Sequence, residues 1–396
     1  MDKVIYLDNN ATTKVDPEVI DAMLPFLSES YGNPASMHTF GGDVAHHVHG
    51  ARMKVAEFIG ADNDYEIVFT GTGSESDNMA ILGSISYYKD KKHIITSRVE
   101  HPAILNLYKK LERDGYRVTI IPVDGKGNLD LEALKDSVDD DTAIVSIMYA
   151  NNETGVIFPV EEIGAFLKER GIPFHVDAVQ AAGKVPIDVD KINCDLLTIS
   201  GHKFHAPKGI GVLYVRRGTR LRPIQYGGHQ EKGRRPGTLN VPGIIAMGKA
   251  SELAMKHLSE PNDLSKLRDK LEKGILKKFG NASLNGDKIK RVPNTTNIGF
   301  EFIEGEAILL YFNEKGIAAS SGSACSSGSL EPSHVLRAMG VPFTSAHGSI
   351  RFSLSRFTTE EEIDYTLSVM PEVIDRLLTI SPYWDNEKKQ GKPINL

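Results

Sequence analysis

The chain has 396 residues, of which 40% are hydrophobic and 25% are charged, and these values are typical of a globular protein with two domains. The net charge of -6 at pH 7 predicts no basic surface, so we expect no nucleic-acid partner. No apolar run reaches the ~20 residues that span a bilayer, so we expect no membrane segment. The N-terminal residues show no signal-peptide pattern, and two distant cysteines give no disulfide framework. We therefore expect a cytoplasmic protein.

Strands and helices alternate through the first half of the chain. A first helix begins where Asp16 provides an N-cap and Pro17 the first helical position. The sequence predicts strands at 66–70, 93–96, 117–121, 143–148, 174–176, 195–199 and 211–215, and helices at 42–59, 102–114, 129–138 and 160–170. This alternation favours an α/β fold with a largely parallel sheet, in which ligands bind beyond the carboxyl ends of the strands.

A turn rich in glycine and serine follows the first strand of this alternating set. Ser74 and Asp77 fit a capping box that opens the next helix. Free N–H groups at such a turn bind anions with the help of the helix dipole, so Gly73 and Ser74 are candidates for a phosphate site. A dinucleotide-binding turn is the competing interpretation, but Ser76 stands where its third glycine would be.

Two neighbouring strands end in residues that suit pyridoxal phosphate. Lys203 follows the strand 195–199, and Asp177 follows the strand 174–176, with Gln180 three residues further on. A desolvated lysine forms a Schiff base with the cofactor aldehyde, and an acidic residue pairs with its pyridine nitrogen. A lone lysine is usually an ordinary surface residue. The nearby Ser200 and His202 favour the cofactor interpretation, whereas the rival Lys208 lies beyond the loop.

Histidines at three further positions call for separate interpretations. His101 lies in a loop at a strand end, where an imidazole stacks on a ring or moves protons. His46 and His49 share a helix face, but no carboxylate or cysteine stands at ligand spacing. We therefore expect a solvated face there and no metal site.

The arginines of the basic loop 227–238 suit a phosphate or a carboxylate.

The second half of the chain has α+β character. A long amphipathic stretch at 242–278 is expected to link two domains. It is followed by predicted strands at 296–300 and 350–354 and predicted helices at 306–315 and 360–378. The polar residues 383–396 are expected to form a loosely ordered tail.

The two cysteines have different surroundings. Cys194 borders a buried strand, as an inert thiol commonly does. Cys325 lies between serines and glycines, which predict an exposed loop. A thiol in such a loop is costly unless its reactivity is used, so we interpret Cys325 as a nucleophile that travels to its target.

These motifs together resemble the NifS/IscS-type cysteine desulfurases, a family of homodimers that depend on pyridoxal phosphate. The resemblance covers most of the chain and rests on motifs in a fixed order: 6–13 (YLDNNATT), 32–34 (GNP), 100–102 (EHP), 151–155 (NNETG), 177–180 (DAVQ), 200–203 (SGHK), 235–238 (RPGT), 321–329 (SGSACSSGS) and 356–361 (RFTTEE).

The resemblance implies the PLP-dependent transferase fold type I. A large domain with a mostly parallel seven-stranded sheet is expected at 15–255. A smaller α+β domain that carries the cysteine loop is expected from 1–14 and 256–384, with a polar tail at 385–396.

By the same resemblance, Lys203 holds the cofactor aldehyde, Asp177 pairs with the pyridine nitrogen and His101 stacks over the ring. Cys325, Lys203 and His101 are then the catalytic residues. Further cofactor contacts are expected from Gly73, Ser74, Asn152, Gln180, Ser200, His202 and Thr238 of the partner subunit. The substrate carboxylate is expected to meet Arg351, with Asn33 and Asn152.

The implied reaction converts L-cysteine to L-alanine and leaves a persulfide on Cys325 for a sulfur acceptor or an iron–sulfur scaffold protein. Assembly of nitrogenase clusters or of iron–sulfur clusters in general would use this sulfur.

A related PLP enzyme acting on another amino acid, such as selenocysteine, stays an alternative. A cofactor-free thiol hydrolase would have to pair Cys325 with His334 or His347. A non-catalytic iron–sulfur scaffold would need more than two cysteines.

Overall fold

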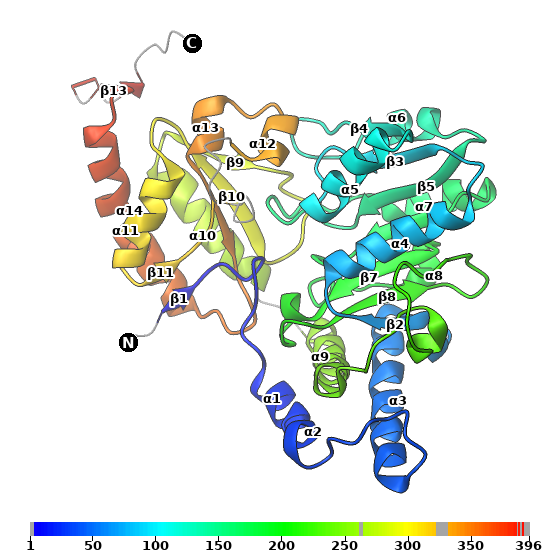
Figure 1. The fold of residues 1–396 in the computed structure, drawn as a ribbon. Helices are drawn as coiled ribbons and strands as arrows, with labels where there is room; N and C mark the ends of the chain where they lie inside the picture. The colour runs from blue at the N-terminus through cyan, green and yellow to red at the C-terminus, as the bar shows by residue number, and fades with distance from the viewer. Residues whose placement is uncertain (1–3, 261–263, 322–331, 386, 389, 392–396) are drawn as a thin grey trace.

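The computed structural model describes residues 4–260, 264–321, 332–385, 387–388 and 390–391, and Cys325 lies outside them. A large α/β domain and a smaller α+β domain lie side by side (Figure 1). None of the described helices combines the length and apolar character that a bilayer span requires.

The large domain is built on a seven-stranded sheet. Its order is β2 (Ile67–Thr70), β8 (Gly211–Val215), β7 (Leu196–Ser200), β6 (Phe174–Asp177), β5 (Thr142–Met148), β3 (His93–Ser97) and β4 (Arg117–Ile121). Only β8 runs against its neighbours, so the predicted mostly parallel seven-stranded sheet is confirmed. Every residue of β5 is buried, as expected for a central strand covered on both faces.

Helices cover both faces of this sheet. Alternate strand residues point to opposite faces, so Val68 and Ile94 pack in one apolar cluster while Ile67 and Ile95 pack in another. The first face is covered by α4 (Gly73–Tyr87) and α5 (Pro102–Arg113). The second is covered by α3 (Thr39–Ile59), α7 (Val160–Glu169), α8 (Val189–Ile192), α9 (Val241–Ser259) and, near the sheet edge, α6 (Leu131–Ser137).

Two short helices precede α3 at one end of the large domain (Figure 1). Asp16 caps α1 (Pro17–Met23) by accepting from the Glu18 N–H, and Pro17 is its first residue, as predicted. A second proline then opens α2 (Pro25–Ser28).

The smaller domain has its own apolar core. Its sheet places β10 (Thr295–Phe300) between β12 (Ser349–Ser353) and β9 (Ala282–Asn285), all antiparallel. The remaining elements are α10 (Leu264–Lys278), α11 (Gly305–Glu314), α12 (His334–Ala338), α13 (Phe343–His347) and α14 (Glu360–Ile380). The N-terminal β1 (Ile5–Tyr6) pairs with β11 (Ile317–Ala318), and Ile5 and Leu7 join the core of this domain. The domain boundaries stay a prediction, which these separate cores support.

Two local predictions were wrong. The helix α4 begins at Gly73 and is capped by Thr72, whose Oγ1 accepts from the Glu75 N–H at 3.1 Å, so Ser74 and Asp77 form no capping box. The stretch 242–278 divides into α9, which packs in the core of the large domain, and α10, which packs in the core of the smaller one, and this agrees with the predicted link. In the polar tail, β13 (Trp384–Asp385) pairs with β14 (Gln390–Gly391), and the centroids of the Trp384 and Phe302 rings lie 5.7 Å apart, so the described part of the tail is ordered.

Gly164 of α7 tests how closely the helices pack on the sheet. A Cβ atom added there would lie 1.7 Å from the Ile192 carbonyl oxygen at the end of α8. We expect Gly164→Ala to lower the free energy of unfolding by about 2–4 kcal/mol, because backbone must move to admit the methyl group. Denaturant unfolding measures this, with Glu162→Ala on the exposed side of α7 as the control. Equal midpoints for the two variants would contradict the packing described.

Candidate active site

A cavity of about 450 Å³ lies at the carboxyl ends of β5, β6 and β7. It brings together most residues that the sequence predicted. These are Gly73, Ser74, His101, Asn152, Asp177, Gln180, Ser200, His202, Lys203 and Arg351. Parallel strands end at one edge of a sheet, which explains why residues scattered over the sequence meet here.

Two predicted residues of the described chain do not line this cavity. The Asn33 side chain accepts from the Ala35 N–H at 3.0 Å and borders a separate hollow beside His49. Thr238 is exposed in the loop before α9. Cys325 lies outside the described residues.

Lys203 lies in a short turn directly after β7. Its Nζ donates to the main-chain oxygens of Asn10 and Ala11, each at 2.8 Å. The turn needs a glycine at position 201, because a Cβ there would lie 2.8 Å from the Ile210 side chain. Lys208 also lines the cavity but is exposed, so the structure favours the half-buried Lys203 as the lysine that meets a buried ligand.

The start of α4 has the N–H groups that an anion site requires. The N–H groups of Gly73 and Ser74 have no intrahelical partner at this end of the helix. A Cβ at position 73 would meet Val179 at 3.1 Å and Ser200 at 3.3 Å, so glycine leaves room at the sheet end. His202 shares a hydrogen bond of 3.2 Å with the Thr12 hydroxyl, and burial and Lys203 lower the His202 pKa to about 4. The helix dipole adds to this donor set, which suits a phosphate.

His101 is the N-cap of α5. Its Nδ1 accepts from the Ala103 N–H at 3.1 Å, so the neutral ring carries its proton on Nε2. Burial, with the nearby Lys203, lowers the pKa of His101 to about 4. The imidazole is therefore neutral at pH 7 and suited to lie against an aromatic ring.

Three buried carboxyl groups lie close together beneath the cavity, and only Asp177 was predicted. Burial raises the pKa of Asp177 to about 6, although the Val179 N–H and Lys203 act against this. Burial also raises the pKa of Glu100 to about 8 and that of Asp77 well above its usual range, and the Asp177 charge adds to both shifts. At neutral pH the cluster therefore carries its negative charge on Asp177.

The contacts of Glu100 and Asp77 agree with this assignment. Glu100 Oε1 accepts from the Ser97 hydroxyl at 2.6 Å and from the Met148 N–H at 2.9 Å. Glu100 Oε2 and Asp77 Oδ1 are buried without a hydrogen-bond partner in the part of the chain that the structure describes. Sequence reasoning used Asp77 as a helix cap and passed over Glu100, because the burial of a carboxyl group is not visible in the sequence.

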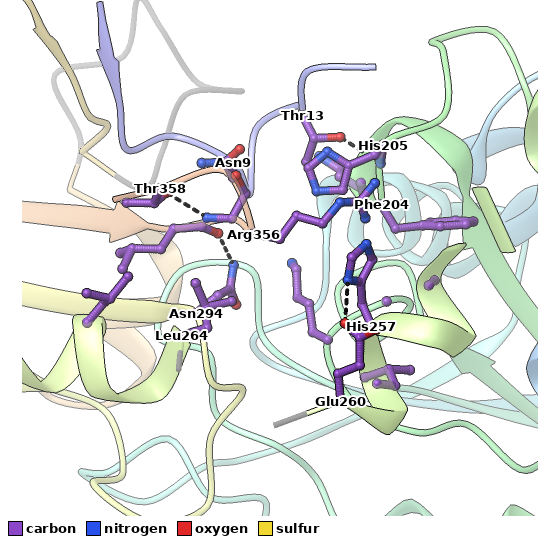
Figure 2. Close-up of a pocket in the computed structure, with 18 residues that line it drawn as sticks. Asn9, Thr13, Phe204, His205, His257, Glu260, Leu264, Asn294, Arg356 and Thr358 are labelled. Atoms are coloured by element: carbon purple, nitrogen blue, oxygen red, sulfur yellow. Dashed lines mark hydrogen bonds and ion pairs between the residues drawn. The ribbon is translucent and has the colours of Figure 1, made fainter. Parts of the chain in front are cut away.

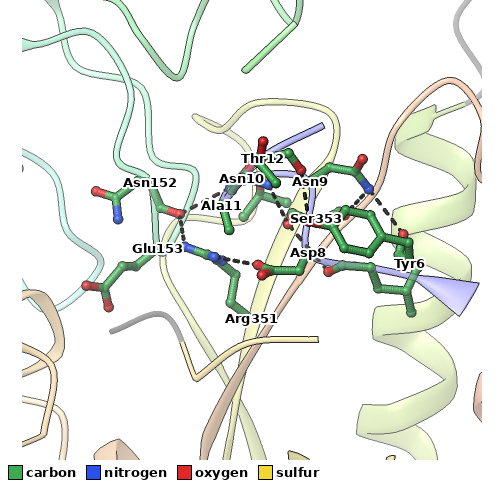
Figure 3. Close-up of polar contacts among 12 residues, drawn as sticks. Tyr6, Asp8, Asn9, Asn10, Ala11, Thr12, Asn152, Glu153, Arg351 and Ser353 are labelled. Carbon is green, nitrogen blue, oxygen red and sulfur yellow. Dashed lines mark hydrogen bonds and ion pairs between the residues drawn. The ribbon is translucent and has the colours of Figure 1, made fainter. Parts of the chain in front are cut away.

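Arg351 on β12 reaches the cavity from the smaller domain (Figure 3). Its Nη2 donates to Asp8 Oδ1 at 2.7 Å and its Nη1 to the Asn152 carbonyl oxygen at 3.0 Å. The Nε atom is buried and has no partner within the described ranges. The guanidinium is thus fixed in direction and keeps N–H groups for a carboxylate.

Asn10 joins the two domains beside Arg351 (Figure 3). Its Nδ2 donates to the Asn152 carbonyl oxygen at 3.1 Å and to Thr295 Oγ1 at 2.9 Å. Its main-chain N–H donates to the Ser353 hydroxyl at 2.9 Å. The sequence motif contained Asn10, but its spacing gave no sign of these contacts.

A second cavity of about 280 Å³ also borders Lys203 (Figure 2). Lys184, His205, His257 and Arg356 line it as well. Arg356 is bound to Asp16, and His257 lies 3.6 Å from Glu260. Lys203 is therefore accessible from two sides of the domain junction.

The chain on either side of residues 322–331 is bound to the rim of the first cavity. Before it, Ser320 pairs with Arg351 through main-chain hydrogen bonds of 2.6 and 3.3 Å. After it, the Ser333 hydroxyl donates to Glu153 at 2.5 Å, and His334 Nε2 lies 3.0 Å from the Glu100 carbonyl oxygen. Both ends of the segment that contains Cys325 are therefore held beside the predicted active site.

Residues 5–366 match the aminotransferase class-V family. The chain belongs to this family. It is 60% identical over 385 residues to a cysteine desulfurase of Trichormus azollae, covering 97% of this chain and 96% of that one. It is 55% identical to cysteine desulfurase NifS of Azotobacter vinelandii, covering 96% and 95%. A solved NifS-like protein superimposes with a TM-score of 0.89 at 41% identity, covering 95% of this chain and 100% of the other.

The predicted relationship to the NifS-type cysteine desulfurases is thereby confirmed, as are the fold type and the cofactor, pyridoxal phosphate. The first cavity fits this cofactor. It has amide donors at a helix start for a phosphate, a buried carboxylate for a pyridine nitrogen and a lysine amine for an aldehyde.

We expect Glu100→Gln to have a higher free energy of unfolding than the wild type at pH 8 but not at pH 4. Burial raises the Glu100 pKa from 4.5 to about 8, so the folded chain keeps a proton that the unfolded chain has released between these values. The stability that depends on Glu100 is therefore full below pH 4.5 and falls as the pH rises to about 8. The difference is at most about 5 kcal/mol.

Denaturant unfolding from pH 4 to pH 9 measures this difference. Glu162→Gln, on the exposed face of α7, is the control and should follow the wild-type profile. A constant offset between Glu100→Gln and the wild type at every pH would contradict a proton on Glu100.

Proposed function

We propose that this chain converts L-cysteine to L-alanine and carries the released sulfur as a persulfide on Cys325. The observation that supports this best is the arrangement of the cavity. Lys203 and Asp177 of the large domain face Arg351 of the smaller one, and the segment with Cys325 is held at the rim on both sides.

Pyridoxal phosphate supplies an aldehyde for the substrate amine and a ring that withdraws electrons from the substrate Cα. Lys203 would hold the aldehyde, Asp177 the pyridine nitrogen and His101 one face of the ring. The ring oxygen would meet Gln180. The phosphate would lie against Gly73, Ser74, Ser200 and His202. We assign Thr238 to the site of a second copy of the chain, because it is exposed and absent from its own cavity.

The substrate carboxylate would bind the guanidinium of Arg351. Asp8 and the Asn152 carbonyl oxygen hold that guanidinium in place, while its buried Nε has no hydrogen-bond partner among the described residues. The Asn152 side chain lines the same cavity. No described contact supports a substrate role for Asn33, so the proposal rests on Arg351 and Asn152.

Lys203 would move the proton from the substrate Cα, because its amine is the basic group nearest to the predicted reacting atoms. The Cys325 thiolate would attack the substrate sulfur. The bond from sulfur to the substrate Cβ breaks, its electron pair stays on carbon, and protonation completes the methyl group of alanine. Cysteine and one thiol thus yield alanine and one persulfide, so this half of the reaction requires no outside oxidant or reductant.

The persulfide sulfur would pass to an acceptor or scaffold protein for iron–sulfur cluster assembly. The identity to the Azotobacter vinelandii relative named NifS supports nitrogenase clusters as one destination. The cytoplasmic location stays a prediction.

We also propose a homodimer. Helices α1 and α2 lie at one end of the large domain (Figure 1), and large apolar side chains of α2 and of the loop that leads to α3 are exposed there. Leu27 is 58% exposed, Tyr31 71% and Met37 102%. Thr238 is also exposed, as it would have to be to reach a partner's cavity. An apolar face of this kind is typical of a surface that a second copy covers.

We expect Cys325→Ala to abolish formation of both alanine and sulfide. The assay contains pyridoxal phosphate, L-cysteine and a reductant, and both products are quantified together. The wild type should give equal amounts of the two. The control is Cys194→Ala, because Cys194 is fully buried and its thiol pKa is raised by that burial. This control should keep at least half of the wild-type rate.

Sulfide at the wild-type rate from Cys325→Ala would remove the assigned role of this thiol. Pyruvate in place of alanine would indicate a PLP enzyme with another reaction.

A further inference from the structure

Lys184 is a second buried lysine at the domain junction, and the proposed reaction gives it no role. A helical turn follows β6, with hydrogen bonds from Ala182 N to Ala178 O and from Val185 N to Ala181 O. This turn places Gln180 and Lys184 four residues apart on one side. Lys184 is only 9% exposed and Gln180 only 6%.

The amine of Lys184 is bound by two amide oxygens. It donates to Asn10 Oδ1 at 2.9 Å and to Gln180 Oε1. No carboxylate pairs with it within the described residues. Burial lowers the pKa of Lys184 well below its usual value, and Lys203 and Arg351 add to the shift.

These contacts decide which way the Gln180 amide faces. Because Lys184 occupies Oε1, the Nε2 group lies on the other side, where it donates to the Asn10 carbonyl oxygen at 3.0 Å. One N–H of Nε2 remains, and Gln180 lines the cavity in which the cofactor is proposed to bind. The reversed amide would turn an oxygen toward the negative ring oxygen of the cofactor, and two acceptors repel each other.

Asn10 is fixed by the same group. Its Oδ1 accepts from Lys184 and from Asn294 Nδ2 at 3.1 Å, while its main-chain oxygen accepts from Gln180 and from Lys203. Lys184 thus contacts both residues that orient polar groups at the cavity, although it does not line that cavity itself.

We propose that Lys184 is a positioning residue that holds the Gln180 amide with its nitrogen toward the cavity, as a hydrogen-bond donor for the ring oxygen of pyridoxal phosphate. This inference rests on the proposed function, because it assumes that the cofactor occupies this cavity.

The test is a double-variant cycle of Lys184→Met and Gln180→Ala. Methionine keeps most of the side-chain length but offers no N–H. We expect Lys184→Met to weaken cofactor binding by about tenfold, the loss expected for one hydrogen bond to a charged oxygen. We also expect the pH midpoint of the visible cofactor absorption to rise, because a donor to the ring oxygen favours its deprotonated form.

Titration of the apoprotein with pyridoxal phosphate and a pH titration of the holoenzyme measure these two effects. In the Gln180→Ala background, Lys184→Met should add almost nothing, because the amide that it orients is absent. Lys191→Met is the matched control, with its side chain 72% exposed, and should keep the wild-type values. Borohydride should still fix the cofactor to Lys203 in every variant.

An unchanged midpoint in Lys184→Met, or effects that add fully to those of Gln180→Ala, would overturn the inference and leave a packing role. If Lys184→Met does not fold, Lys184→Gln keeps amide donors on a shorter chain and should shift the midpoint in the same direction by less. A wild-type midpoint in that variant would also overturn the inference. Failure of the wild type itself to bind pyridoxal phosphate would instead overturn the proposed function.

Discussion

The hydrogen bonds of Asn10 are the constraint on which the arrangement of both domains depends. Asn10 is 2% exposed, and a buried amide without partners would cost several kcal/mol. Its partners come from the large domain, where they include Lys203 and Gln180, and from the smaller domain, where they include Thr295 and Ser353. The hydrogen bonds of Asn10 to both domains can all form only when the two domains lie in this relative position.

That position brings the two halves of the site together. Lys203 follows a strand of the large sheet, whereas Arg351 belongs to the small sheet. Asp8, two residues before Asn10, binds the Arg351 guanidinium, and the Asn10 carbonyl oxygen binds the Lys203 amine. The N-terminal segment thus sets the separation between the Lys203 amine and the Arg351 guanidinium, the groups that we propose move the proton and bind the substrate carboxylate.

Burial leaves few charges around the cavity. His101 and His202 are neutral at pH 7, and Glu100 keeps its proton. Asp177 remains a carboxylate, and Lys203, Lys208 and Arg351 are the lysine and arginine side chains that line the cavity. Charges in such a site act over a medium of low dielectric constant, so each has more effect than in water. A single carboxylate among neutral side chains suits pyridoxal phosphate, because the carboxylate favours a proton on the pyridine nitrogen of the cofactor.

The sequence predicted the sheet, the family and the cavity residues at strand ends, because these depend on short-range patterns. Apolar runs predicted β5 and β7, and the polar residues after them identified Asn152 and Lys203. The roles of Asn10 and Lys184 could not be predicted from the sequence. Their partners lie 142 to 343 residues away or, for the contact between Lys184 and Gln180, on a turn that no periodicity indicated. Ser74 and Asp77 had the spacing of a capping box, but the helix begins at Gly73 and Thr72 is its N-cap.

The central claim is that Lys203, held by Asn10 at the end of β7, is the lysine that binds the cofactor. Borohydride reduction of the wild-type holoenzyme, followed by peptide mass mapping, tests this most directly. The account predicts the phosphopyridoxyl label on Lys203 alone. A label on Lys184, which borders only the second cavity, or on the exposed Lys208 would contradict it.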